Sequence, residues 1–371
     1  MTWPDPPMPG PVPRPPPKGT ALSHPTLASL GWDALHTAEF APYDDLAVPG
    51  RVVRVDRGAA DVLTADNPVR VATDTAAEPL AVGDWVALVA TDDRRWIVDT
   101  VLRRRSAIRR AVVSGESHAQ VVAANVDVVL VAVPAIPAIP EPRIGMVERM
   151  VALAWDSGAT PVVVLTKADL VTDPETVAAD LAASAPGVDV VAVSAATDRG
   201  FDALAPWLQD GRTVCLLGRS GAGKSTLANA LLGFDHLATR DIRSDGKGRH
   251  TTTHRELVVL PGGGCLIDTP GLKGVGLWLG DDGLDRAFAD IEELVPLCRF
   301  ADCRHETEPG CAVLAAIDAG TLPARRLESW RKLQREAVWM ASRTDARLRA
   351  EQSRKWRAIH QEMRRSGRTR P

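Results

Sequence analysis

Two patterns of apolar residues divide the chain. Between about Val48 and Ile108, apolar residues come in short runs, and turn-forming residues separate the runs. Such runs predict β-strands, and five of them within roughly sixty residues favour a small barrel, most simply an OB-fold. The exposed face of an OB-fold commonly binds single-stranded RNA, although such a barrel can also pack on its neighbours and bind nothing. The predicted strands cover residues 52–55, 61–64, 69–72, 84–89 and 96–101.

Farther along, the apolar runs are more continuous, which is typical of buried strands in an α/β sheet. Runs at 161–165, 189–193 and 212–217 predict three such strands, and residues 226–232 have helical character. Two later runs flank Pro261-Gly262-Gly263-Gly264, a hairpin signal. The central region is therefore predicted to be an α/β domain.

A glycine-rich loop lies between the strand at 212–217 and the helix at 226–232. Glycines at a strand-to-helix turn let backbone N–H groups converge on phosphate oxygens, and the helix N-terminus favours negative charge. Lys224 is expected to reach the β and γ phosphates, and Ser225 to hold magnesium. The predicted phosphate loop and first helical residue are Gly218, Arg219, Ser220, Gly221, Ala222, Gly223, Lys224, Ser225 and Thr226.

The residues expected to recognise the base precede this loop. Thr166, Lys167 and Asp169 follow the strand at 161–165, at the end where α/β sheets bind ligands. A carboxylate only accepts hydrogen bonds, and guanine offers two adjacent donors whereas adenine does not. Ser194 and Ala195 end the next strand, where a backbone N–H is expected to contact the guanine carbonyl. Because ordinary GTPases have the opposite order, the arrangement predicts a circularly permuted GTPase domain.

The segment after the phosphate loop supplies the remaining nucleotide contacts. Asp268 is expected to organise the magnesium shell, the Gly271 N–H to sense the γ-phosphate, and one of three successive threonines, preferably Thr252, to bind magnesium. Leu272 occupies the position where related enzymes often orient water with Gln, so intrinsic hydrolysis should be slow. The catalytic candidates are Lys224 and His250. A histidine at position 250 could equally be an ordinary exposed loop residue with no catalytic role.

Three cysteines and one histidine cluster within fourteen residues near the C-terminus. Four such ligands can close a tetrahedral structural zinc site, whereas a catalytic site would keep one position open. The alternative is a set of unrelated reduced cysteines. Cys215 and Cys265 lie in apolar strands and are expected to be core residues, so a reducing cytoplasm is expected. The predicted zinc ligands are Cys298, Cys303, His305 and Cys311.

Charge and composition set the domain plan. The formal net charge is −3, yet residues 343–371 hold ten Lys/Arg against three Asp/Glu. This segment is predicted to form a basic helix. Its side chains could contact RNA phosphates, or they could simply form a solvated face. Arg103-Arg104-Arg105 and Arg109-Arg110 could also touch phosphate. No apolar run is long enough to cross a bilayer. The expected domains are a disordered Pro-rich tail (1–45), the barrel (46–110), the GTPase (111–284) and a helical zinc-binding domain (285–371).

This combination resembles the bacterial ribosome small-subunit-dependent GTPase A family. Two further segments carry the resemblance, Ala123-Ala124-Asn125-Val126-Asp127 and residues 326–333. The family often has Tyr where this chain has Trp330. The resemblance implies a late-acting factor in small-subunit maturation whose GTP hydrolysis the subunit stimulates and whose barrel and zinc domain contact ribosomal RNA. We also expect a monomer. An RNA-binding scaffold with nucleotide as a structural ligand is the alternative.

Overall fold

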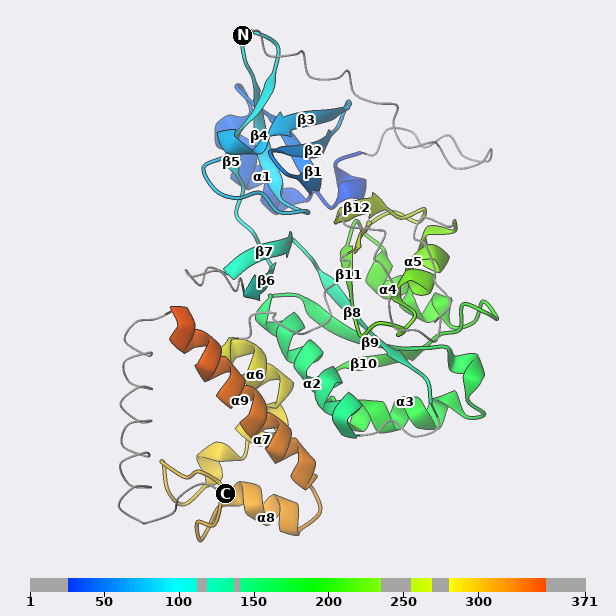
Figure 1. Ribbon diagram of the computed structural model, residues 1–371, viewed down its shortest axis with the longest axis vertical. Helices are drawn as coiled ribbons and strands as arrows, with labels where there is room; N and C mark the ends of the chain where they lie inside the picture. The colour runs from blue at the N-terminus through cyan, green and yellow to red at the C-terminus, as the bar shows by residue number, and fades with distance from the viewer. Residues whose placement is uncertain (1–25, 112–118, 137–140, 235–254, 269–279, 345–371) are drawn as a thin grey trace, which may run out of the picture.

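The computed structural model describes residues 26–111, 119–136, 141–234, 255–268 and 280–344. In Figure 1 the N-terminal barrel and the C-terminal helices lie at opposite ends, with the central sheet between them. The chain thus places two small units on either side of a larger α/β body.

The barrel-like unit is antiparallel. Its core is aliphatic, with Val52, Val62, Val86 and Leu88 completely buried. β1 is central because it pairs with both β2 and β4, and β3 packs against β5. The five strands match the predicted ones and are β1 (Val48–Asp56), β2 (Ala59–Thr64), β3 (Pro68–Ala72), β4 (Trp85–Ala90) and β5 (Trp96–Val101), with the short η3 (Thr73–Thr75) between β3 and β4.

Residues 26–45 differ from the disordered tail expected for 1–45. They form η1 (Ala28–Leu30), α1 (Ala34–Phe40) and η2 (Ala41–Tyr43). The Asp33 side chain accepts from the backbone N–H groups of residues 35 and 36 and so caps α1, while Leu30 and Phe40 are buried. Tertiary burial of two apolar side chains therefore orders a segment whose local composition favours loops. Residues 1–25 lie outside the described part.

The strand after the barrel does not extend it. Among the described strands, β6 (Ala107–Ala111) pairs only with β7 (Ala119–Ala124), and the two form a separate antiparallel sheet. Arg109 and Arg110 on β6 are exposed. The described chain therefore passes from the barrel to the central sheet through a two-stranded ribbon.

The central sheet is parallel except at one edge. Its order is β10-β9-β8-β11-β13-β12, and only β12 runs antiparallel to its neighbour β13. The strands are β8 (Val128–Pro134), β9 (Thr160–Thr166), β10 (Asp189–Ala192), β11 (Thr213–Leu217), β12 (Glu256–Val259) and β13 (Cys265–Asp268). The connecting helices are α2 (Glu141–Asp156), η4 (Ala168–Leu170), α3 (Pro174–Ala183), η5 (Phe201–Leu204), α4 (Ala205–Leu208) and α5 (Lys224–Leu232).

The barrel is joined to this sheet edge to edge. β1 pairs antiparallel with β12 at Arg54 and Glu256, so hydrogen bonding runs continuously from barrel to sheet. Gly83, with a φ of 93°, packs its backbone on Ala124, and a Cβ there would lie 2.1 Å from the Ala124 carbonyl oxygen. Glycine is required at this contact because both the conformation and the space exclude a side chain.

The C-terminal helices dock on α2. α9 lies beside α2 and α6 in Figure 1 and contacts both helices. Arg326 on α9 is fully buried and forms ion pairs with Glu148 of α2 (3.0 Å) and Asp290 of α7 (2.5 Å). This ionic network fixes one unit on the other. The elements are α6 (Asp281–Ala287), α7 (Ala289–Glu292), η6 (Val295–Leu297), α8 (Ala312–Asp318) and α9 (Ala324–Thr344).

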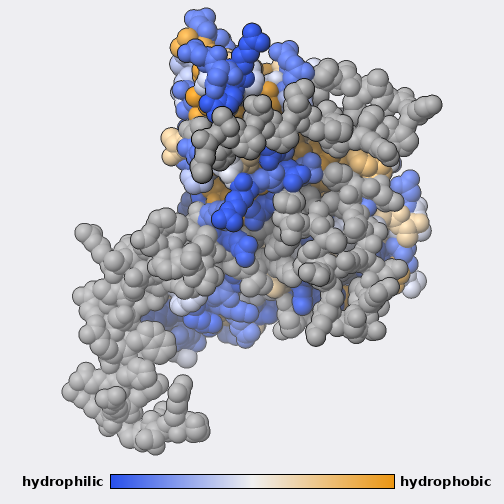
Figure 2. Space-filling model, turned by 45° about the horizontal axis from the view of Figure 1, so that its top comes forward, coloured by the Kyte–Doolittle hydropathy of each residue, from blue (hydrophilic) through white to orange (hydrophobic). Residues whose placement is uncertain are grey.

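Surface hydrophobicity is scattered. On the face in Figure 2 most coloured residues are hydrophilic, and orange residues appear in small groups. The large exposed apolar side chains come in ones and twos from different elements, such as Leu46, Leu297, Phe300 and Trp339. No helix in the described part of the chain is long and apolar enough to span a bilayer. The predicted basic helix lies outside the described residues beyond position 344.

Candidate nucleotide site and metal centre

The glycine-rich loop connects β11 to α5 as predicted. β11 ends at Leu217 and α5 begins at Lys224. Gly218 has a φ of 150°, and a Cβ there would lie 2.7 Å from the Ala132 carbonyl oxygen on the neighbouring β8. Gly223 has a φ of 84°, in the left-handed region. The loop thus wraps closely around the start of α5, as a phosphate-binding loop requires.

Lys224 lies across this loop. Its Nζ donates hydrogen bonds to the carbonyl oxygens of Gly218 (2.8 Å) and Arg219 (2.9 Å). A cation held over a glycine-rich turn at a helix N-terminus favours an anion. Ser225 and Thr226 follow it in the first turn of α5, the position from which a hydroxyl can reach magnesium.

The predicted base-recognition loop lies directly against the phosphate loop. Thr166 Oγ1 is 2.6 Å from the carbonyl oxygen of Ala222 and 3.3 Å from that of Val133. Thr166 is 4% exposed, so this bond is made away from water. Two segments 56 residues apart in the chain, in the order opposite to that of ordinary GTPases, therefore meet.

The carboxylate expected to read guanine is held from the next loop. Ser194 Oγ donates to Asp169 Oδ1 at 2.5 Å, and the Ala168 N–H donates to the Val193 carbonyl oxygen. Sequence reasoning assigned only a backbone contact to Ser194 and missed this side-chain role. Ala195 is exposed beside it. Lys167 adopts a φ of 58°, which turns the chain between β9 and η4.

The remaining predicted nucleotide residues are only partly described. Asp268 ends β13, and its backbone pairs with Glu256 on β12. Because β13 lies next to β11, the carboxyl ends of the two parallel strands meet at the edge that carries the phosphate loop. His250, Thr252, Gly271 and Leu272 lie outside the described residues.

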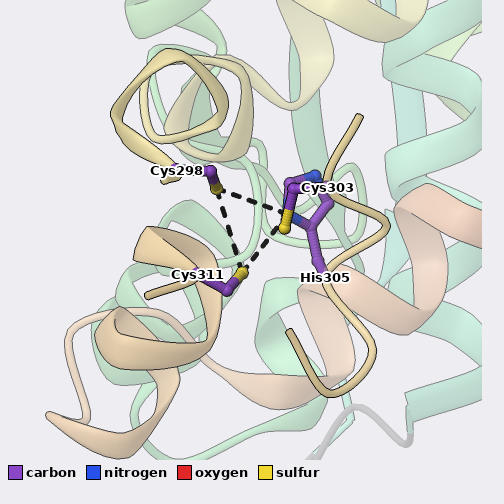
Figure 3. A group of neighbouring side chains, drawn as sticks. All are labelled: Cys298, Cys303, His305 and Cys311. Carbon is purple, nitrogen blue, oxygen red and sulfur yellow. Dashed lines mark hydrogen bonds between the residues drawn. The ribbon is translucent and has the colours of Figure 1, made fainter. Parts of the chain in front are cut away.

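The four predicted metal ligands converge in the C-terminal unit (Figure 3). Their ligand atoms all lie within 4.8 Å of one another. His305 Nδ1 is 3.6 Å from Cys298 Sγ and 3.4 Å from Cys311 Sγ, and the two sulfurs are 3.9 Å apart. Tetrahedral bonds to a zinc-sized ion separate two sulfurs by about 3.8 Å and a sulfur from a nitrogen by about 3.5 Å. The cluster therefore fits one tetrahedral metal ion.

The surroundings of the cluster hold it in place. His305 has a φ of 58° and is buried, and burial lowers the pKa of its imidazole, which favours the neutral, metal-binding form. Arg331 Nη2 donates to the carbonyl oxygens of Arg304 and His305. Cys311 Sγ accepts the N–H of Leu314 and caps α8. Arg331 was not predicted, because nothing in the spacing of the ligands indicates which distant helix packs on them.

The arginine run at 103–105 has a structural role in part. Arg104 forms an ion pair with the buried Asp84, at 2.6 Å, and Arg105 donates to both carboxylate oxygens of Asp33, each at 2.6 Å. Arg105 thus fixes the N-terminal segment to the chain that leaves the barrel, whereas Arg104 stabilises the barrel itself. The sequence could not distinguish them from the exposed Arg109 and Arg110.

Comparison with known proteins identifies the family. A family model described as RsgA GTPase matches residues 101–278. The protein named small ribosomal subunit biogenesis GTPase RsgA from Streptomyces avermitilis is 54% identical over 350 residues, which cover 91% of this chain and 92% of that protein. The protein of the same name from Streptomyces coelicolor is 55% identical over 341 residues, which cover 89% and 91%. This chain belongs to the RsgA family.

Solved structures agree with the fold of an RsgA-family protein. The crystal structure of YjeQ from Thermotoga maritima superposes with a TM-score of 0.59 at 24% identity, over 79% of this chain and 99% of that one. YloQ, described as a circularly permuted GTPase, superposes with a TM-score of 0.56 at 25% identity, over 78% and 95%. The predicted fold class, a barrel with a permuted GTPase domain and a C-terminal metal-binding unit, is thus confirmed.

Proposed function

We propose that this protein is a GTPase of small ribosomal subunit biogenesis. The observation that carries the proposal is the hydrogen bond from the Thr166 hydroxyl to the Ala222 carbonyl, which joins the base-recognition loop to the phosphate loop. The curated relatives carry the corresponding name. The strands fall in the order that a permuted GTPase needs.

In the proposed complex the chain binds GTP from two sides. Backbone N–H groups of the phosphate loop and the Lys224 ammonium hold the phosphates, and Asp169 accepts the two guanine donors while Ser194 fixes its orientation. Magnesium, held by Ser225 and Thr252 with Asp268 nearby, would neutralise phosphate charge. His250 is the candidate for positioning water. Leu272 cannot do so, and we therefore propose that hydrolysis is slow without an outside stimulus.

The proposed outside stimulus is the small subunit and its RNA. Arg54 and Arg70 on the barrel already pair with Asp56 and Asp61, so their charges are balanced within the protein. The exposed Arg109 and Arg110 of the ribbon offer guanidinium groups nearer the GTPase body, which makes them the stronger candidates for phosphate contact. We further propose a monomer that works in the cytoplasm at a late maturation step.

We propose that the metal is zinc and that its role is structural. Three thiolates and one imidazole suit zinc, and four protein ligands leave no position for substrate. The bound ion would tie η6, the loop before α8 and the Cys311 cap of α8 together. The chemistry of GTP hydrolysis takes place elsewhere.

The deciding experiment measures GTP turnover with and without purified small ribosomal subunits. An enzyme of this class should turn over at least about tenfold faster with subunits, because transition-state groups supplied in trans stabilise the transferred phosphoryl. Lys224→Ala should abolish both rates, and Lys332→Ala, at an exposed lysine on α9, should change neither. Equal turnover with and without subunits would instead favour the scaffold that holds nucleotide as a structural ligand.

A further inference from the structure

A pocket lies at the end of the central sheet opposite to the phosphate loop. It has a volume of about 550 Å³ and is formed by three parts of the chain, the N-terminal segment, the barrel and the amino-terminal ends of β8, β9 and β11. Thr213 lies on its wall and begins β11, whereas the phosphate loop follows Leu217 at the other end of that strand. At the usual rise of a strand the two sites are separated by about 13 Å or more.

The walls of this pocket hold a concentration of unpaired polar atoms. Seven buried side-chain atoms in the described residues have no hydrogen-bond partner. Four of the seven belong to pocket residues that are at most 3% exposed: His36 Nε2, Arg51 Nε, Trp85 Nε1 and Thr213 Oγ1. Buried polar groups in folded proteins are normally paired with protein, water or ligand. Each of the four atoms exposes less than 1 Å², so a ligand in the pocket would reach them only after these side chains turn toward it. Their gathering around one pocket is the observation from which we argue for such a ligand.

The chemistry of these atoms restricts the ligand. Arg51 Nε and Trp85 Nε1 can only donate, and the Arg51 Nη groups are already bonded to the carbonyl oxygens of Leu30 and Asn125. The ligand must therefore carry acceptors such as carbonyl oxygens. The indole rings of Trp32 and Trp207, both partly exposed on the pocket wall, can stack on a planar ring.

The charges that line the pocket nearly balance, so the pocket is not a site for a highly charged anion. Three arginines and three aspartates line it, and Asp33 is paired with Arg105, whose guanidinium holds the pKa of that carboxyl well below its usual range. Asp127 accepts the N–H of Thr213 at 2.7 Å. Arg212 is partly exposed on the wall, and a phosphate could contact its guanidinium. A ring with carbonyl groups and a single phosphate fits this balance better than a run of phosphates.

We propose that this pocket binds one nucleotide with a carbonyl-bearing base, either a free mononucleotide or an unstacked residue of a single-stranded RNA. Pockets of this volume accommodate ligands of this size. The site is distinct from the proposed GTP site, because the two lie at opposite ends of β11. The proposal does not depend on GTP turnover.

The test uses the full-length protein loaded with GDP, so that the phosphate loop is occupied. Uridine monophosphate, adenosine monophosphate and a short oligouridylate are titrated by calorimetry. Uridine monophosphate should bind more tightly than adenosine monophosphate, because the adenine ring has no carbonyl oxygen. An oligouridylate affinity more than tenfold above that of the mononucleotide would assign the site to RNA, and equal affinities would assign it to a free nucleotide.

Two variants each remove one unpaired atom. Thr213→Val is nearly isosteric, whereas Trp85→Phe also removes part of a buried ring system. Thr213→Val and Trp85→Phe should each weaken uridine monophosphate binding by about fivefold or more, since each removes one hydrogen bond to the ligand. Thr213→Val should melt at the same temperature or higher, because its hydroxyl has no partner within the described protein. Thr100→Val on β5 is the matched control and should leave this binding intact. No binding of any probe, or full affinity in both pocket variants, would overturn the proposal.

Discussion

The metal centre and the nucleotide site are assembled in opposite ways. All four metal ligands lie within the fourteen residues from Cys298 to Cys311, so the chain keeps them near one another. The nucleotide site is built from loops at 166–169, 194–195 and 218–225, which meet only because β9, β10 and β11 belong to one parallel sheet. A local site can be damaged by losing one ligand, whereas a distributed site depends on contacts between loops.

The largest effect is expected from the local site. Cys298→Ser should lower the bound metal from about one equivalent to about zero and cost several kcal/mol of the stability of the C-terminal unit, because binding a structural ion is part of its folding free energy. Metal analysis measures the bound ion, and limited proteolysis of the full-length protein, followed at residues 280–344, reports the stability of the C-terminal unit. GDP affinity should persist.

Cys215→Ala is the matched control for this experiment. Cys215 is a buried cysteine of β11 that is far from the metal centre in sequence and takes no part in it. Its replacement should leave the metal content unchanged. A Cys298→Ser protein that retains a full equivalent of metal would contradict the ligand assignment.

The next largest effect is expected at the contact between the C-terminal unit and helix α2 of the central domain. Arg326→Met should destabilise the protein by about 3–5 kcal/mol in urea unfolding, because the buried Glu148 would keep only Arg325 as a partner and Asp290 would lose its ion pair. Adding Glu148→Leu should recover much of that loss. Arg95→Ala removes an exposed ion pair with Asp93 and should leave unfolding unchanged. Equal effects of Arg326→Met and Arg95→Ala would show that the buried network does not hold the units together.

The preference of the nucleotide site for guanine is expected to depend strongly on the Asp169 carboxylate. Asp169→Asn should weaken GTP by about tenfold to a hundredfold and improve xanthosine triphosphate, because an amide N–H would face the guanine donors. Competition binding with the two nucleotides measures the change in preference. Asp173→Asn, at the neighbouring helix cap, should leave the preference unaltered. An unchanged preference in Asp169→Asn would remove Asp169 from base recognition.

The same contrast explains what could be predicted from the sequence. The metal ligands, the five barrel strands and the strands that frame the phosphate loop follow from spacing and periodicity, which are local properties. The buried Arg326 and Glu148 pair, 178 residues apart, leaves no local signal. The sequence predicts a disordered tail for residues 26–45, because the burial of Leu30 and Phe40 depends on a partner surface that composition does not reveal. The ion pair of Arg104 with the buried Asp84, 20 residues away, leaves no local signal for the same reason.

The smallest expected effect tests the contact that makes the nucleotide site one unit. Thr166→Val keeps the shape of the side chain but removes the hydroxyl that bonds to Ala222. GDP affinity should fall by about fivefold to tenfold, the equivalent of one buried hydrogen bond, while metal content is unaffected. Thr166→Ser keeps the hydroxyl and should retain most of the affinity, and a fluorescent GDP analogue measures all three proteins. If Thr166→Val binds GDP as tightly as the parent protein, the sheet alone positions the two loops, and the distributed site is more robust than its single bridging bond indicates.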